Sequence, residues 1–139
     1  MKSLKQLAVT AFIGTLVCSG LYAQNTSMLA TIPFDFHAGK TVMPAGEYRI
    51  EGKGSFVILR GAEGGMPIVS LLTNGAVGPE SGRKGSLVFH RYGDAYFLTK
   101  IWNSYSRMGR ELLPTADEKE VARRWNGPAK TGVVIASSN

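Results

Sequence analysis

Six basic side chains fall within one stretch, residues 83–110, of this 139-residue chain. Asp94 is the only acidic residue in that stretch, so the net charge there is +5. Two of the aromatic residues in that stretch, Trp102 and Tyr105, lie close to the charges in the sequence, where they could stack on sugar rings or bases. The pattern predicts a patch for anionic sugars, phosphates or an acidic protein surface, and its plainer alternative is a set of scattered solubilising charges. The residues of this predicted patch are Arg83, Lys84, Arg91, Lys100, Trp102, Tyr105, Arg107 and Arg110.

The strand pattern around these charges predicts how they are arranged. Residues 87–91 and 95–102 are expected to form a hairpin with a tight turn at Gly93. With a two-residue turn, Arg91 and Lys100 share one face of the sheet, whereas a three-residue turn would shift the strand pairs. The two basic segments that flank the hairpin are then expected at the end far from the turn.

Metal and cofactor chemistry is not indicated. A zinc site usually needs three or four protein ligands, whereas the chain has two histidines, His37 and His90, and one cysteine, Cys18. Nothing in the spacing of the carboxylates supplies the missing ligands, so no metal site and no cofactor are predicted. His90 is expected to be a hydrogen-bonded strand residue stacked on Phe97, and His37 an exposed turn residue.

No catalytic residue is predicted either. A glycoside hydrolase needs two carboxylates at a fixed separation across a cleft. Asp35 and Asp94 lie beside predicted turns, and Glu47 and Glu51 form the polar face of a predicted strand. The glycine-rich segment 73–85 lacks the glycine spacing and the Lys-Ser/Thr ending of a phosphate-binding loop, and no serine lies in a recognisable nucleophile elbow. We expect that segment to be a flexible, exposed loop.

Residues 1–23 have the features of a cleavable signal peptide in the right order. Lys2 and Lys5 give a positive start, and an apolar run follows that is too short to span a bilayer of about 30 Å. Ala23 is the small residue that precedes a cleavage site. Cys18 follows a valine rather than a small residue, so lipidation is not expected, and the mature chain is expected to carry no disulfide. The prediction is export, to the periplasm or the exterior.

Residues 24–139 are expected to form a single β-rich domain with a net charge of +4. This part has no run of about eighteen apolar residues, so no transmembrane span is predicted. A membrane barrel is disfavoured, because it needs at least about eight strands of about ten residues each. The mild positive charge points to no specific nucleic-acid partner.

Alternating or continuous apolar residues predict the strands. The clearest case is Glu47 to Glu51, whose strict alternation places Tyr48 and Ile50 on a buried face. Short glycine-containing connections between the strands are typical of consecutive antiparallel hairpins. Residues 24–28 are expected to be a polar leader and residues 103–110 to be irregular. The predicted strands are 29–36, 47–51, 56–59, 68–72, 87–91 and 95–102.

One helix is predicted over residues 116–125. Thr115 and Glu118 match a capping box, in which the threonine accepts from the backbone N–H of residue 118 and the glutamate reaches back to residue 115. Asn126-Gly127-Pro128 ends the helix. Residues 129–139 are either a last strand or a frayed tail.

Three parts of the chain carry a resemblance. They are Ile32-Pro33-Phe34-Asp35-Phe36 with Pro44-Ala45-Gly46-Glu47-Tyr48, the hairpin 87–98 with Ile101-Trp102, and Gly109-Arg110-Glu111-Leu112 with the helix after it. Together they resemble a family of small exported bacterial proteins that have no assigned function. The resemblance implies export and a single domain, and it implies no activity, substrate or catalytic residue.

The expected fold is mainly β: an antiparallel β-sandwich or small closed barrel of six or seven strands with one short C-terminal helix. The expected function is that of an exported, non-enzymatic module. It would bind an envelope component, such as an anionic polymer, or a partner protein through the basic, aromatic-rimmed patch. The alternative is a small hydrolase acting on envelope polymer. A deep cleft joining His90 with an acidic residue would favour the hydrolase, whereas a flat or sealed surface would favour the module.

Overall fold

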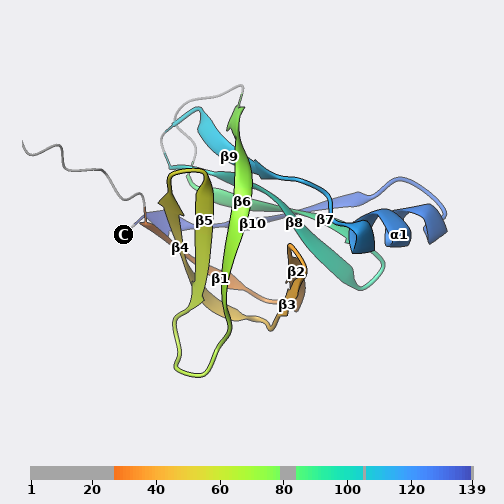
Figure 1. Cartoon of the computed structure of the whole chain (residues 1–139), viewed down its shortest axis with the longest axis horizontal. Helices are drawn as coiled ribbons and strands as arrows, with labels where there is room; N and C mark the ends of the chain where they lie inside the picture. The colour runs from red at the N-terminus through yellow and green to blue at the C-terminus, as the bar shows by residue number, and fades with distance from the viewer. Residues whose placement is uncertain (1–26, 79–83, 105, 139) are drawn as a thin grey trace, which may run out of the picture.

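The computed structural model describes residues 27–78, 84–104 and 106–138, so the predicted signal peptide lies outside it. The described chain is mainly β, with two layers of strands and one short helix at one end (Figure 1). The helix is α1 (Ala116–Arg124). The strands are β1 (Ser27–Ile32), β2 (Phe36–Ala38), β3 (Thr41–Met43), β4 (Gly46–Lys53), β5 (Phe56–Gly61), β6 (Ile68–Val77), β7 (Ser86–Tyr92), β8 (Ala95–Trp102), β9 (Met108–Leu112), β10 (Lys130–Ile135) and β11 (Ser137–Ser138).

The strands form one hydrogen-bonded sheet that folds over into a sandwich and is not closed into a barrel. Its main path is β10-β7-β8-β9-β6-β5-β4-β1-β11, and every neighbouring pair on that path is antiparallel. The β2–β3 hairpin joins β8 through one parallel pairing, His37 opposite Phe97. β6 belongs to both layers, because its first half pairs with β5 and its second half with β9. The sandwich is therefore confirmed, whereas the closed-barrel alternative and the expected count of six or seven strands are both wrong.

Three predicted boundaries are wrong for identifiable reasons. β1 ends at Ile32, because Pro33 has no N–H to donate to a ladder, and it begins at Ser27, inside the predicted polar leader. The predicted exposed loop 73–85 starts as strand, since β6 continues to Val77 and pairs with β9. β9 begins within the stretch 103–110, which was expected to be irregular, because pairing with both β6 and β8 outweighs the polar composition.

The β7–β8 hairpin has the predicted turn but a different arrangement of charges. Gly93 has a φ of +62°, and Arg91 lies opposite Tyr96 as expected. A bulge in β8 then shifts the register, so that Lys100 lies opposite Val88. Because side chains alternate between faces, this one-residue shift moves Lys100 to the face opposite Arg91. The expectation that Arg91 and Lys100 share a face is wrong.

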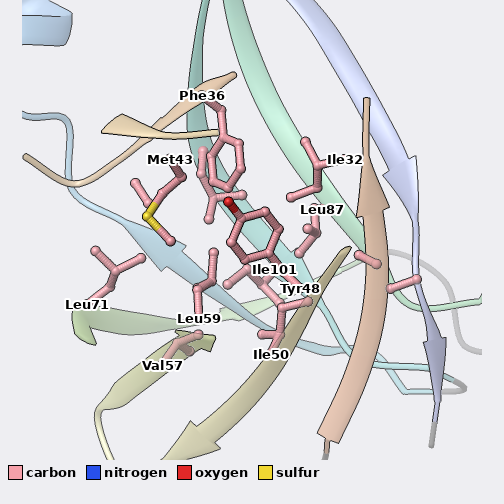
Figure 2. Packing of buried hydrophobic residues seen from close by; sticks show 14 of the residues in the cluster. Ile32, Phe36, Met43, Tyr48, Ile50, Val57, Leu59, Leu71, Leu87 and Ile101 are labelled. Atoms are coloured by element: carbon pink, nitrogen blue, oxygen red, sulfur yellow. The ribbon is translucent and has the colours of Figure 1, made fainter. Parts of the chain in front are cut away.

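The hydrophobic core fills the space between the two layers. Tyr48 and Ile50 are both buried, as their alternation predicted, and Figure 2 shows them among residues from β2, β3 and β5. The Tyr48 ring meets Phe36 edge-on, with centroids 5.4 Å apart, and its hydroxyl donates to the carbonyl oxygen of Pro44. Burial raises the pKa of Tyr48, and the negative charge of Asp35 raises it further. This residue thus links the core to the β3–β4 turn.

Helix α1 begins at the predicted cap but uses its first-turn glutamate differently. Thr115 Oγ1 accepts from the backbone N–H of Glu118 at 3.2 Å, as predicted. The Glu118 carboxylate turns to the sheet instead of back to Thr115: its Oε1 lies 2.8 Å from His90 Nδ1 and accepts from the Tyr92 hydroxyl at 3.4 Å. The helix is therefore fastened to the outer face of β7. Within the described ranges, no helix is long and apolar enough to cross a membrane.

The C-terminal segment is strand, so the frayed-tail alternative is wrong for residues 130–138. β10 pairs with β7 along its whole length, from Lys130 opposite Arg91 to Ile135 opposite Ser86. After Ala136, whose N–H donates to the carbonyl of Gly85 at 2.8 Å, β11 pairs with β1. The last described residues thus contact both layers.

Candidate functional site

The fold divides the predicted patch. Lys84, Arg107 and Arg110 lie on segments that meet at one end of the sandwich, where the Lys84 side chain lines a separate hollow of about 350 Å³ with Leu29 and Ser137. Arg91 lies at the other end of the β7–β8 hairpin, beside its turn. Arg83 and Tyr105 lie outside the described residues. The end that holds Lys84, Arg107 and Arg110, together with Lys53, consists of residues 53–56, 77–78, 84–86, 102–104 and 106–110, and we call it the loop end.

Hydrogen bonds between distant segments hold the loop end together. Gly78 and Arg107 are joined twice: the Gly78 N–H donates to the Arg107 carbonyl at 2.7 Å, and Arg107 Nε donates to the Gly78 carbonyl at 3.1 Å. The Gly85 N–H donates to Ser104 Oγ at 3.0 Å. The described ends of the β6–β7 and β8–β9 connections are therefore fixed against each other. They lie at the end of the hairpin far from the Gly93 turn, where the two basic segments were expected.

Two members of the predicted patch, Arg91 and Lys100, lie away from the loop end and contact other residues of the sheet. The Arg91 guanidinium lies 5.3 Å from the centroid of the Tyr96 ring, and its Nε donates to the Gly93 carbonyl at 2.7 Å. These contacts stabilise the hairpin turn. Lys100 is half-buried on the outer face of β8, where Glu111 is its neighbour on β9. Neither residue belongs to the loop end.

Trp102 is half-buried and packs on glycine backbone. A Cβ at Gly78 would lie 3.2 Å from its ring, and one at Gly109 would overlap it. Trp102 lies opposite Gly109 on β9, so strand alternation places it on the other face of the sheet from Arg110. Trp102 therefore borders the Gly78–Arg107 side of the loop end and does not line the hollow that Arg110 faces.

Arg110 is half-buried and extends from β9 across the loop end to the β4–β5 turn. Its Nη1 donates to the Gly54 carbonyl at 2.7 Å and to Thr73 Oγ1 at 3.2 Å. Gly52 leaves room for the guanidinium, since a Cβ there would lie 3.1 Å from Nη2. The ion pairs found among the described residues do not include Arg110. Its guanidinium is thus fixed in position by neutral acceptors.

Two adjoining hollows share Arg110 and Asn103, and we call them together the Arg110 cleft. The smaller has a volume of about 60 Å³ and reaches the core, and the larger has a volume of about 250 Å³. The Arg110 guanidinium and the Asn103 amide border both hollows, and such donors suit carboxylate or phosphate oxygens. The Thr73 hydroxyl already donates to the Ser55 carbonyl at 3.1 Å. Met108, which is 58% exposed, adds an apolar wall. The larger hollow is lined by Gly54, Ser55, Thr73, Gly75, Asn103, Met108, Gly109 and Arg110.

Sequence reasoning missed three residues of this site: Lys53, Thr73 and Asn103. Charge density in the sequence is enough to single out Arg110. Its two hydrogen-bond acceptors cannot be found in this way, because they lie 37 and 56 residues away in the chain. Lys53 is exposed and directly precedes the turn that the arginine contacts. No local pattern marks residues that only a long-range strand pairing brings together.

The histidines also differ from expectation. His37 is half-buried and stacks on Phe97, with ring centroids 4.3 Å apart, so it is not the exposed turn residue expected. His90 is a hydrogen-bonded strand residue, as expected, but its partner is Glu118 and its ring lies edge-on to Tyr92 instead of stacking on Phe97. Burial raises the pKa of Tyr92, and the charge and hydrogen bond of Glu118 raise it further. Four hollows, of about 60, 250, 350 and 430 Å³, are all lined by residues other than these. The His90–Glu118 pair therefore fastens the helix and borders none of these hollows.

The part of the chain that the structure describes contains no group of three or more His, Cys, Asp or Glu side chains that could hold a metal ion. Comparisons with models of known families, with characterised proteins and with solved structures find no match. The functional argument therefore rests on the chemistry of the loop end.

Proposed function

We propose that this chain is an exported, non-enzymatic binding module that holds an anionic envelope component at the loop end, with Arg110 as the central contact. One observation carries the proposal: a half-buried guanidinium, fixed through Nη1 and outside the described ion pairs, faces a hollow of about 250 Å³. Removing a charge from water without a counter-charge is costly. A carboxylate or phosphate group in the hollow would supply that counter-charge and accept from the remaining N–H groups.

Exposed charges around the cleft would attract such a ligand. Lys53, Lys84 and Arg107 are exposed on segments that meet at the loop end, and no acidic residue lies in those described segments. Their contribution acts at a distance and is screened over about 8–10 Å at ordinary salt concentrations. We therefore assign attraction to these three residues and specific contact to Arg110.

The hydrolase alternative has less support. His90 and Glu118 form the histidine–carboxylate pair that general-base catalysis commonly uses. However, the carboxylate is buried under α1 and also accepts from Tyr92. The absence of this pair from the lining of the four hollows favours the module. The envelope as the place of action rests on the predicted signal peptide.

Binding to polymers of defined charge tests the proposal. We expect the protein to bind polygalacturonate and polyphosphate at low salt, to release both as salt is added, and not to bind neutral dextran. Arg110→Gln should raise the Kd for the better-bound polymer at least about tenfold, since it removes the one charge fixed inside the cleft. Isothermal titration calorimetry measures all of these.

Arg60→Gln is the matched control, because it removes the same charge from an exposed strand position on β5. It should change the Kd less than about twofold. Thermal unfolding of each variant establishes that it is folded. Equal losses for Arg60→Gln and Arg110→Gln would show that only net charge matters, and no binding to either charged polymer at low salt would contradict the proposal.

A further inference from the structure

β6 has an unpaired edge over its first half. Residues Ile68–Leu72 pair with β5 on one side, whereas β9 pairs with β6 only from Thr73 onward, where Leu112 is the last residue of β9. Figure 1 shows β9 leaving β6 at this level towards α1. Among the described residues, none hydrogen-bonds to the other edge of Ile68–Leu72.

The ladder to β5 fixes which backbone groups this edge presents. The Thr73 N–H donates to the Ser55 carbonyl at 2.9 Å, so Thr73 directs its backbone groups towards β5. Backbone direction alternates along a strand, and the odd-numbered residues of this segment therefore face β5. Ile68, Ser70 and Leu72 direct their N–H and C=O groups to the unpaired edge.

The side chains on this edge lack the usual protection of edge strands. Ile68 and Leu72 are 59% and 61% exposed, and Phe56, opposite Leu72 on β5, is 47% exposed. Edge strands are commonly blocked by charge, proline or a bulge, and residues 68–72 contain none of these. An exposed apolar edge of this kind is a template for another strand.

We propose that this edge pairs with the same edge of a second copy of the chain, antiparallel about a two-fold axis at Ser70. In that register Ser70 lies opposite the partner's Ser70, and Ile68 lies opposite the partner's Leu72. All residues that present free backbone groups then oppose one another, as a hydrogen-bonded antiparallel ladder requires. A two-fold axis also makes the contact self-complementary and closed.

The side chains favour a second copy in this register. On the outer face, Phe56 lies beside Leu72, and Leu72 lies beside the partner's Ile68, so these three side chains form a continuous apolar row. The two-fold axis generates a second, identical row. No charged residue lies opposite its own copy, because Arg60 is one strand further from the axis. A shift of the axis to Leu71 would place Asn74, whose edge β9 already occupies, opposite the partner's Ile68. The interface adjoins the loop end, because Phe56 belongs to both, but it includes none of the residues that line the larger hollow of the Arg110 cleft.

Single cysteines test the register directly. In a full chain carrying Cys18→Ser, the introduced cysteine is the only one. We expect Ser70→Cys to give a disulfide-linked dimer under mild oxidation, because directly paired Cα atoms lie about 5.5 Å apart, within disulfide range. Leu72→Cys alone should not cross-link, whereas a mixture of Ile68→Cys and Leu72→Cys should give the mixed dimer.

Sedimentation tests the dimer without cross-linking. Ser70→Lys places like charges opposite each other and should raise the dimer dissociation constant at least about tenfold. Thr131→Lys puts the same charge on the exposed part of β10 and should leave the dimer unchanged. The dimer proposal would be overturned if the unmodified protein were monomeric at about 100 µM, or if Ser70→Cys and Leu72→Cys cross-linked equally. If the Ser70→Lys variant is monomeric and still binds the polymer, the loop-end function does not depend on the dimer.

Discussion

The contact between Glu118 and His90 should control the docking of α1. The helix has nine residues, too short to be stable alone, so it depends on contacts with the sheet. Glu118 is the residue of the helix that the fold buries, and its Oε1 lies 2.8 Å from His90 Nδ1. We expect Glu118→Ala to release the helix from β7 while leaving the sandwich folded.

The magnitude follows from the burial of the two groups. A hydrogen bond to a charged group contributes about 1.5–3 kcal/mol to stability. The Glu118 side chain is 7% exposed but His90 is 41% exposed, so water screens part of the interaction. We expect a coupling of about 1 kcal/mol between the residues, and a total loss of about 2 kcal/mol for Glu118→Ala.

A double-mutant cycle measures the coupling. The proteins are the wild type, Glu118→Ala, His90→Ala and the double variant, compared by urea unfolding at neutral pH. Tryptophan fluorescence is a suitable probe, because the Trp125 ring packs close to Gly93 when the helix is docked. Hydrogen exchange of residues 116–124 should accelerate in each single variant. Additive effects, within about 0.3 kcal/mol, would refute the reasoning.

Three further outcomes are expected. Gly109→Ala should cost about 1–3 kcal/mol in urea unfolding, because its methyl group would overlap the Trp102 ring, whereas Gly75→Ala meets open space and should cost nothing. The raised pKa values of Tyr48 and Tyr92 mean that the folded state holds these protons more tightly, so the contribution of the two tyrosines to stability should be constant below pH of about 10 and fall above it; a stability profile that stays flat from about pH 10 to about pH 11.5 would contradict this. Mass spectrometry of protein expressed in a bacterium should find a chain shortened by about 2 kDa, and intact residues 1–23 would contradict the predicted signal peptide.

The parts of the fold that local sequence predicts are those with local causes. Strict alternation from Glu47 to Glu51 places Tyr48 and Ile50 in the core, and the structure confirms both. The tight turn at Gly93 and the Thr115 cap are likewise confirmed, because each depends on a few adjacent residues. In these segments, propensity and burial favour the same conformation.

The parts that could not be predicted depend on residues far apart in the chain. A single bulge in β8 decides the face of Lys100, and neither the charge nor the apolar pattern of the hairpin shows it. Residues 108–112 form a strand because β6 and β8 both pair with them. The same pairing brings Arg110 to Gly54 and Thr73. Charge density therefore predicts which part of the chain holds the cleft, but it does not predict the contacts that shape it.

The most direct test of the loop end as an anion site is a backbone amide NMR titration with a short oligogalacturonate. The account predicts saturable shifts centred on Gly54, Gly75, Gly109 and Arg110, which line the larger hollow. These shifts should disappear at about 0.5 M salt, as screening removes the attraction. Shifts centred on His90, or spread evenly over the exposed lysines and arginines, would contradict it.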